Sequence, residues 1–485
     1  MKILFIYSLQ DVQSSHKPLK SPEEIHFGIS YISSLLKQHG HQTKLIVLSK
    51  VFGKQNINIL DKAIIDFKPR LVCFTAVSSE YGFIAKAARH LKAKNKQIFT
   101  LVGGTHVSLN PQEAINDYFD AICVGEGEYP TLELVEQLER NEKPTGIANL
   151  IIKQESSLEK NPPRPFIDNL DALPIPDRQM WLEWIDAQLG SRHSVLLGRG
   201  CAFECTYCSN HAIKRIASGN YVRFRSPDKI IEEIRWIVDN FPGQKEIYLE
   251  VETFYINKDW ALRVCEKLEK LNLTLSKPLT FGVNLRIMPN CDLQPLFIAL
   301  KKSNFRFVNI GLESGSEEVR RVILKRNYSN SDLINAVKLA RKYALKVAFF
   351  NLIGVPGETF NDFRETIDMN RICLPDWHWT SIFFPYPGTE LYKTAENMGL
   401  LKVNPDFIPE RNKAFLDLPG FSRRQIQKNF EWFEYDVYKG IKPIHKILVK
   451  VLITKLKTNL YFVYFYRYFS RLRLGKVLKR KFSDK

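Results

Sequence analysis

The stretch RGCAFECTYCSN, residues 199–210, places three of the chain's eight cysteines within eight positions. Cys201, Cys205 and Cys208 are separated by three and then by two residues, and no fourth cysteine lies close by. Soft thiolate ligands suit zinc or an iron-sulfur cluster. A 4Fe-4S cube held by only three cysteines leaves one iron without a protein ligand, and that iron can bind a small molecule.

Structural zinc is the alternative interpretation of this loop. His211 follows Cys208 after a two-residue gap, so three thiolates and one imidazole are available. Structural zinc ligands usually come as two separated pairs, whereas these candidates crowd one loop. We therefore favour the iron-sulfur interpretation and keep zinc as its rival.

The cysteine loop follows the first of six β-type runs that alternate with helical patterns. The runs are HSVLLGRG (193–200), KEIYLEVE (245–252), LTFGVNLR (279–286), FRFVNIGLES (305–314), KVAFFNLIG (346–354) and WTSIFFPYPG (379–388). Six units in about 200 residues are fewer than the eight of a full barrel. The sequence predicts a partial (β/α)6 barrel over residues 191–400, with the cysteines at the carboxyl ends of its strands, where barrel chemistry is found.

The first 140 residues predict a second α/β domain. Five β-type runs alternate with helical stretches: KILFIYS (2–8), TKLIVL (43–48), RLVCFTAV (70–77), QIFTLVGG (97–104) and DAICVGEG (120–127). This order is typical of a doubly wound, Rossmann-like parallel sheet, whose ligand lies at the carboxyl ends of the strands. Two of these ends carry glycines, at 103–104 and at 125–127.

A proline-rich segment, NPPRPFIDNLDALPIPDR (161–178), follows this domain. Prolines exclude helix interiors and central strands, so we expect residues 141–190 to be an interdomain linker. The N-terminal MKILFIYSLQ lacks the pattern of a leader peptide, and no run of 18 uncharged apolar residues occurs. The remaining cysteines are scattered among apolar residues, so we expect a reducing, cytoplasmic setting.

Residues 401–485 are expected to form a helical C-terminal region with a basic, amphipathic tail. Residues 439–485 hold 14 Lys or Arg and one acid, Asp484. This composition is compatible with a nucleic-acid surface, with a helix on anionic lipid, or with a packing helix whose basic face is solvated. We favour an anionic membrane surface over nucleic acid, because the apolar residues are dense and mostly aliphatic.

Together with three later stretches, the cysteine spacing resembles the radical S-adenosylmethionine (SAM) superfamily. The stretches are GLESG (311–315), NLIGVPGE (351–358) and FPYPGT (384–389), and Tyr207 before the last cysteine also fits the pattern. With the N-terminal domain included, residues 1 to about 400 resemble the cobalamin-binding branch. The resemblance implies a 4Fe-4S cluster on Cys201, Cys205 and Cys208, whose open iron chelates SAM.

The resemblance also implies which residues bind SAM. Glu252, at the end of the second barrel run, is expected to accept hydrogen bonds from the SAM ammonium, and Arg286 to pair with its carboxylate. Glu313 and Ser314 are candidates for the ribose or methionyl part. Tyr207 and Gly354 complete the expected SAM contacts. Where this branch often has two adjacent acids, the sequence has Val251 and Glu252.

The N-terminal domain resembles cobalamin-binding domains. VGGTHVSLNP (102–111) and VGEGEYPTLEL (124–134) match the loops that face the corrin and its nucleotide tail. The residues that this implies for cobalamin binding are Gly103, Gly104, Thr105, His106, Gly125, Glu126, Gly127 and Glu128. The Asp-x-His-x-x-Gly pattern of a histidine-ligated cobalamin is absent, so we assign no lower cobalt ligand. We expect His106 to form hydrogen bonds or packing contacts in the corrin loop.

The resemblance implies an enzyme that functionalises an unactivated carbon, with the chemistry carried by its cofactors rather than by an assigned catalytic side chain. We expect radical methyl transfer to a lipid or secondary metabolite. Cyclisation or ring rearrangement without methyl transfer is the alternative outcome, and a zinc-containing membrane-surface binding protein is the alternative of another class. The expected partners are the substrate, an electron donor such as flavodoxin or ferredoxin, and an anionic membrane bound through residues 439–485.

Overall fold

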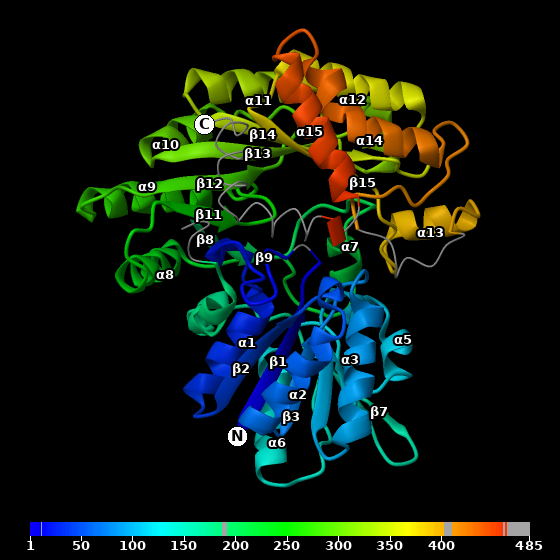
Figure 1. The fold of residues 1–485 in the computed structure, drawn as a ribbon. Helices are drawn as coiled ribbons and strands as arrows, with labels where there is room; N and C mark the ends of the chain where they lie inside the picture. The colour runs from blue at the N-terminus through cyan, green and yellow to red at the C-terminus, as the bar shows by residue number, and fades with distance from the viewer. Residues whose placement is uncertain (11, 187–191, 402–409, 459–460, 463–485) are drawn as a thin grey trace. The chain divides into compact units, whose positions relative to one another are not determined.

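The computed structural model describes residues 1–10, 12–186, 192–401, 410–458 and 461–462. The chain divides into two compact units, each assembled from more than one segment (Figure 1). The first unit contains Met1–Gly190, Ser209–Arg223 and Tyr386–Gly388, and the second contains Ser191–Cys208, Phe224–Pro385 and Thr389–Lys485.

The first unit is built on a seven-stranded sheet in the order β2-β1-β3-β4-β5-β6-β7. The first five strands pair in parallel, and the last two pairings are antiparallel. The strands are β1 (Lys2–Ser8), β2 (Gln42–Leu48), β3 (Leu71–Thr75), β4 (Phe99–Gly103), β5 (Ala121–Cys123), β6 (Leu150–Lys153) and β7 (Leu158–Lys160).

Helices cover both faces of this sheet, as expected for a doubly wound fold. Ile3 and Phe5 of β1 pack with residues of α1 (Phe27–Gln38) and α6 (Glu128–Glu139). Leu4 and Ile6 point to the other face, where α2 (Gln55–Phe67) and α3 (Tyr81–Lys94) lie. Because β1 lies between β2 and β3, the order reverses there, and the expected ligand position is the carboxyl edge of β1 and β3.

The segment expected to be a linker, residues 141–190, is instead part of the first unit. It contributes β6 and β7, and Trp181 of its 3-10 helix (Gln179–Trp184) is fully buried in the core. The Trp181 indole donates a hydrogen bond to Ser30 Oγ at 2.8 Å. Prolines exclude helix interiors and central strands, but they do not prevent a segment with apolar residues from packing against a sheet.

The second unit contains the expected six-stranded, open parallel barrel. Its strand order is β15-β14-β13-β12-β11-β8, and every neighbouring pair is parallel. The strands are β8 (Arg192–Leu196), β11 (Glu246–Glu250), β12 (Thr280–Leu285), β13 (Phe305–Glu313), β14 (Lys346–Ile353) and β15 (Trp377–Ile382). The helices between them are α8 (Pro227–Asn240), α9 (Lys258–Thr274), α10 (Gln294–Lys302), α11 (Asn330–Lys342) and α12 (Phe360–Cys373).

Local sequence explains where these helices begin. Ser226 caps α8 through its side chain, and Pro227 occupies the first turn, where its missing N–H costs nothing. Ser329 with Asp332, and Thr359 with Asp362, form capping boxes at the starts of α11 and α12. These caps fix where each strand-to-helix connection ends, and those connections carry the candidate site.

The C-terminal helices α14 (Arg423–Tyr438) and α15 (Ile444–Lys457) pack on the barrel beside α12 and β15. Their apolar side chains, including Phe430, Phe433, Ile447 and Val451, form a separate core cluster with residues of α12. Among the described helices, none is long and apolar enough to cross a membrane.

A buried carboxylate holds α15 against α14. Glu434 of α14 accepts a hydrogen bond from His378 Nε2 at 2.8 Å, and Lys450 Nζ and Lys442 Nζ lie 3.2 and 3.6 Å from its Oε1. Burial acts to raise the pKa of Glu434, but the hydrogen bond from His378 and the charges of His378 and the two lysines lower it to about 2. The carboxylate therefore stays ionised at neutral pH.

We expect Glu434→Gln to loosen α15 because it removes the negative charge that the two lysines face. Hydrogen exchange of the α15 amides should accelerate about tenfold at neutral pH, in the range of one lost charged hydrogen bond. The pKa of Glu434 is about 2 in the folded protein, against an ordinary value of 4.5. The ionised carboxylate therefore stabilises the folded state above pH 4.5, and this stabilisation is lost as the pH falls towards 2. The difference in melting temperature between variant and wild type should therefore shrink over that range.

Glu431→Gln, on the same helix, is the matched control, because its carboxylate accepts a hydrogen bond from Gln427 within α14. Exchange in α15 that responds equally to both substitutions would contradict the role of Glu434.

Candidate functional site

The three cysteines lie in an irregular loop of the second unit that follows β8 and the short β9 (Gly198–Arg199). Cys201 and Cys205 are buried, and Cys208 is half-buried. Arg286, just after β12, donates a hydrogen bond from its guanidinium to Cys205 Sγ at 3.0 Å. The same guanidinium lies 3.6 Å from the centre of the Phe203 ring. A buried positive charge thus lies against the thiols.

Three loop thiols beside a buried guanidinium form a donor set that suits an iron-sulfur cluster. Among the described residues, no three His, Cys, Asp or Glu side chains are arranged to hold one metal ion. Thiolates that bind different irons of a cube are spaced by the cube itself. The Arg286 guanidinium is suited to an anionic cluster, because a positive charge favours thiolates. The residues present therefore fit the expected cluster.

Glu252 and Arg286 are at the ends of neighbouring strands, β11 and β12. Both lie close enough to the cysteine loop to act on Cys201, whose pKa is raised chiefly by burial, further raised by the Glu252 charge and lowered by that of Arg286. Glu252 is exposed, whereas Arg286 is buried. An acid and a base beside the thiols are the pair needed to bind the ammonium and carboxylate of an amino acid.

A buried arginine connects the cysteine loop to the end of β13. Arg326 donates to the Gly311 carbonyl at 2.7 Å and to the Tyr207 hydroxyl at 3.2 Å, and it lies 3.6 Å from Glu313 Oε1. Glu313 has a φ of 61°, in the left-handed region that non-glycine residues rarely occupy. Burial raises the pKa of Tyr207 well above its usual value, so its hydroxyl stays protonated.

Arg326 is a site residue that the sequence analysis missed. The GLESG stretch drew attention to residues 311–315, but Arg326 follows it after a π-helix (Val319–Ile323) and reaches back to it. The basic pair Lys325-Arg326 before Asn327 was the available signal, and it was weak. Arg320, fully buried in the π-helix, also supports the loop by donating to the carbonyls of Ser314 and Gly315.

Ser314 does not offer its hydroxyl to a ligand. The residue is fully buried, and its Oγ lies 3.5 Å from Thr366 Oγ1 of α12. The following Gly315 donates from its backbone N–H to Thr366 Oγ1 at 2.8 Å, and a Cβ at Gly315 would lie 2.1 Å from the Glu365 carbonyl oxygen. Ser314 therefore anchors the loop on α12, and Glu313 is the polar side chain of this loop that remains a candidate for SAM.

The turn after β14 is held by a second buried acid, Glu358. Its Oε2 accepts hydrogen bonds from Gly354 N at 2.5 Å and Val355 N at 3.2 Å. Burial raises the pKa of Glu358 to about 8, so the carboxyl is mostly neutral at pH 7. Gly354 has a φ of 78°, and a Cβ there would lie 3.0 Å from Ile426 of α14. Helix α14 thus covers the turn that carries this expected SAM contact.

In the first unit, the expected cobalamin loops lie at the carboxyl ends of β4 and β5. Gly103, Thr105, Gly125 and Gly127 are half-buried there. Gly104 has a φ of 104°, and a Cβ on it would lie 2.6 Å from the Ala76 carbonyl oxygen. Glycine at this position is therefore required by the protein's own backbone, and a bulkier side chain would displace the loop whether or not a corrin is bound.

His106 packs against other residues of the first unit. Only 3% of it is exposed, and its ring stacks on Tyr81 with centres 4.3 Å apart. Its Nδ1 is 3.1 Å from Ser78 Oγ, and its Nε2 is 3.2 Å from Glu113 Oε2. Both ring nitrogens therefore face protein groups.

Glu126 and Glu128 also face protein groups. The Glu126 carboxylate accepts two hydrogen bonds from Arg223 at 3.0 Å and one from the Ile167 N–H at 2.7 Å. Glu128 begins α6 and is buried. Neither side chain is arranged to contact a corrin, and the expectation for these two acids is revised to a structural role within the first unit.

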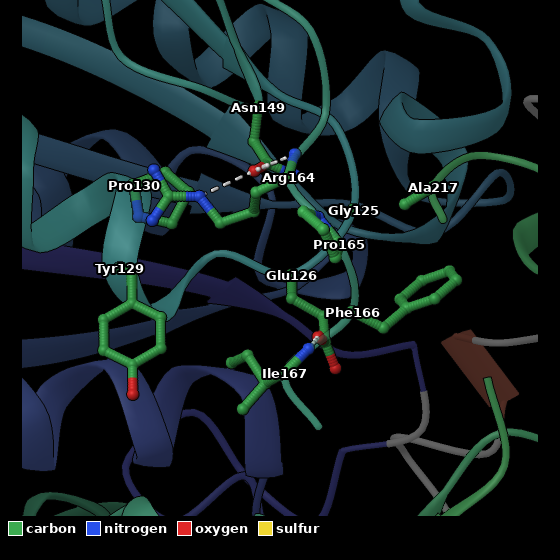
Figure 2. A pocket seen from close by; sticks show the side chains of 10 residues that line it. All are labelled: Gly125, Glu126, Tyr129, Pro130, Asn149, Arg164, Pro165, Phe166, Ile167 and Ala217. Atoms are coloured by element: carbon green, nitrogen blue, oxygen red, sulfur yellow. Dashed lines mark hydrogen bonds between the residues drawn. The ribbon is translucent and has the colours of Figure 1, made fainter. Parts of the chain in front are cut away.

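A small pocket lies beside Gly125 and Glu126 (Figure 2). Asn149 accepts hydrogen bonds from the backbone and side chain of Arg164, and Phe166 and Tyr129 add aromatic walls. Its volume of about 10 Å³ is close to the minimum for one water molecule. This pocket is too small for a corrin ring.

Both units match known protein families. Residues 195–369 match the family model for the radical SAM superfamily, and residues 22–135 match that for the B12 binding domain. A methyltransferase of Pyrococcus horikoshii described as uncharacterized is 29% identical over 409 residues, which cover 83% of this chain and 85% of the relative. Hopanoid C-3 methylase of Methylococcus capsulatus is 25% identical, with 76% of this chain and 68% of the relative covered.

Solved structures share the fold. The radical SAM methyltransferase TsrM from Kitasatospora setae, solved with cobalamin and a [4Fe-4S] cluster, matches with a TM-score of 0.64 at 16% identity, covering 93% of this chain and 90% of that one. The cobalamin-dependent radical SAM enzyme OxsB, solved with aqua-cobalamin, matches with a TM-score of 0.67 at 15% identity, covering 99% of this chain and 76% of that one. The α/β architecture predicted from the sequence is confirmed.

The cluster assignment predicts that Cys201→Ser, Cys205→Ser and Cys208→Ser each abolish assembly, because each removes the protein ligand of one iron. Iron and acid-labile sulfide should fall from about four of each per chain to near zero after anaerobic reconstitution. Cys291→Ser, which changes a half-buried thiol outside the loop, and His211→Ala should keep the full content. A complete cluster in Cys205→Ser, or its loss in His211→Ala, would refute the assignment.

Proposed function

This chain belongs to the cobalamin-binding branch of the radical SAM superfamily, and we propose that it transfers a methyl group to an unactivated carbon of a lipid or secondary metabolite. The observation that carries the proposal is the combination, in one chain, of a B12-binding domain with a barrel whose three loop cysteines lie against a buried arginine. Relatives named as methyltransferases or methylases support methyl transfer over other outcomes.

When bound, the 4Fe-4S cluster, SAM and cobalamin supply the radical and the methyl group, and the protein supplies placement. Cys201, Cys205 and Cys208 would hold the cluster. The guanidinium of Arg286 would form charge-assisted hydrogen bonds to the SAM carboxylate, and Glu252 would accept them from its ammonium.

Two further groups would hold SAM at the end of β13 and β14. The Glu313 carboxylate, kept in place by Arg326, would accept hydrogen bonds from the ribose or methionyl portion, and the backbone of the Gly354 turn would lie beside the ligand. Tyr207, fixed by Arg326, would orient the cysteine loop rather than transfer a proton, because its pKa is too high to ionise near neutral pH.

The first unit would bind cobalamin at the carboxyl edge of its sheet, through the half-buried Gly103, Thr105, Gly125 and Gly127. Gly104 shapes the β4 loop by its contact with Ala76. The hollow required by a corrin would thus be bounded by backbone rather than by charged side chains, which suits a large, mostly apolar macrocycle.

Ring formation or rearrangement is the second candidate outcome. It is supported by the anaerobic magnesium-protoporphyrin IX monomethyl ester cyclase of Rubrivivax gelatinosus, 25% identical over 376 residues that cover 75% of this chain and 65% of the relative. The structural-zinc alternative is set aside, because the chain belongs to the radical SAM superfamily. We further propose a reducing, cytoplasmic setting with a flavodoxin or ferredoxin as electron donor, which the eight free cysteines favour.

The proposal predicts that cells fed trideuteriomethyl-methionine make a labelled metabolite or lipid that is absent when the gene is deleted. The purified chain, reconstituted with iron, sulfide and cobalamin, should cleave SAM under reduction. A gene-dependent product without the label would replace methyl transfer by cyclisation or rearrangement. Absence of SAM cleavage by a protein that holds its full cluster would overturn the proposal.

We propose in addition that α15 docks the enzyme on anionic lipid. Ile447 and Val451 are buried on α14, whereas Ile444, Leu448 and Leu452 on the same helix are about half exposed. Lys446, Lys455 and Lys457 are exposed on this helix, and residues 439–483 contain no acid. An exposed apolar ridge among cations is typical of a helix that lies in a membrane interface. Each engaged lysine contributes about 1 kcal/mol near an anionic surface.

Full-length protein should therefore sediment with vesicles of phosphatidylserine and phosphatidylcholine, and added salt should release it. Leu448→Glu combined with Leu452→Glu should reduce the bound fraction at least about tenfold, since two apolar anchors become acids. These variants are preferable to removal of α15, which would uncover Ile447 and Val451. Leu273→Glu, an exposed position on α9, is the control. Equal binding by all three proteins would leave α15 as a packing helix only.

A further inference from the structure

Three aromatic side chains lie on the inner face of the barrel, on its last two strands. Register pairs Phe350 of β14 with Trp379 of β15, and Ala348 with Trp377. Side chains alternate along a strand, so these residues face away from Val347 and Phe349, which belong to the core under the helices. We call Phe350, Trp377 and Trp379 the aromatic wall.

The aromatic wall packs against the buried Phe307 at one end and has the exposed Trp379 at the other. Phe307, packed against Gly282, lies 5.5 Å from Trp377, and Trp377 lies 6.0 Å from Trp379. Trp379 and Phe350 are stacked nearly parallel, with centres 5.0 Å apart and planes 21° apart. Trp379 is 43% exposed, so part of its side chain is accessible to a ligand.

The wall is level with the candidate SAM contacts. Gly311 of β13 pairs with Phe350, and Phe350 pairs with Trp379. On the other side of β13, Leu285 pairs with Ile310, so the next residue, Arg286, lies in the row of Gly311. A molecule on Phe350 and Trp379 would therefore share the strand row of Arg286, a proposed SAM contact. A radical reaction requires the substrate to be held near SAM.

A buried polar atom lies next to the wall without a protein partner. Asn309 is 3% exposed, and its Nδ2 donates to the Tyr248 hydroxyl at 2.9 Å and to Asn284 Oδ1 at 3.3 Å. Its Oδ1 has no hydrogen-bond partner among the described residues. Register places Asn309 beside Ala348 and therefore in the row of Trp377. A buried acceptor left unpaired is costly, and an N–H or O–H group of a ligand would satisfy it.

We infer that the aromatic wall is the substrate-binding surface, and that the substrate carries a flat conjugated ring system with a donor group that reaches Asn309. This inference rests on the proposed function and names its substrate class. A flat ring extends the stacked Phe350–Trp379 pair by offset stacking. A saturated chain would gain apolar contact from the wall, but it would leave the Asn309 oxygen unpaired.

Protoporphyrin IX is a suitable probe, because it is flat, conjugated and carries ring N–H groups. The test uses the full chain loaded with its cluster and with cobalamin, so that the cobalamin site is already filled. Titration by absorbance and tryptophan fluorescence should show saturable binding. Trp379→Ala should weaken it about tenfold or more, as expected for loss of one stacking platform, whereas Trp379→Phe should weaken it by less than about threefold.

Two comparisons make the result decisive. Leu273→Ala, which changes an exposed apolar residue on α9, should leave binding of the probe unchanged. Stearic acid should compete weakly, and its affinity should not depend on Trp379. Equal affinities in wild type and Trp379→Ala, or stearic acid binding with the same affinity and the same sensitivity, would overturn the inference.

Asn309→Leu supplies a second variant and should weaken binding of the probe while thermal unfolding shows a folded protein. Cleavage of SAM by the wild type is measured separately. If wild-type protein cleaves no SAM but binds the ring through Trp379, the proposed function fails and the binding surface stands. If SAM is cleaved but Trp379 does not matter to ring binding, the inferred substrate class alone fails.

Discussion

Parallel strand pairing determines where the candidate ligand sites of both units lie, because parallel strands all end at the same edge of a sheet. In the second unit that edge brings together the cysteine loop after β8, Glu252 after β11 and Arg286 after β12. In the first unit it brings together the loops after β3, β4 and β5. Side chains distant in sequence therefore become neighbours because their strands end at the same edge.

Buried charged and polar side chains then fix the positions of the loops. Arg326 joins Tyr207 to Glu313, Arg286 lies against Cys205, and Glu358 closes the Gly354 turn. Each of these groups is taken out of water, which is tolerated because each has charged or hydrogen-bonding partners. Preorganised loops of this kind can place a substrate without rearranging at the moment of reaction. The same principle extends to α15, where Glu434 faces two lysines and a histidine.

The elements most visible in the sequence were those with strong hydrophobic periodicity. The five parallel strands of the first unit and the first five strands of the barrel lie where apolar runs predicted them, because buried strands need such runs. The last barrel strand, β15, overlaps only the start of its predicted run, 379–388, and is only partly buried. β6 and β7 were missed, since they are short and β7 is largely exposed. The segment expected to be a linker belongs to the first unit because it supplies β6, β7 and several buried apolar side chains, among them Leu150, Leu170 and Trp181, and its prolines do not prevent that packing.

The sequence alone determined the cysteine spacing, the order of strands and helices, and the glycines at turns, because these depend on chemistry and periodicity within a few residues. Only the tertiary structure decided which polar side chains are open to a ligand. Ser314, Glu126 and Glu128 have the right residue types but face α12, Arg223 or the core. Arg326 and Asn309 acquired their significance through contacts across the barrel. Orientation and burial depend on packing between distant segments, and no local pattern encodes that packing.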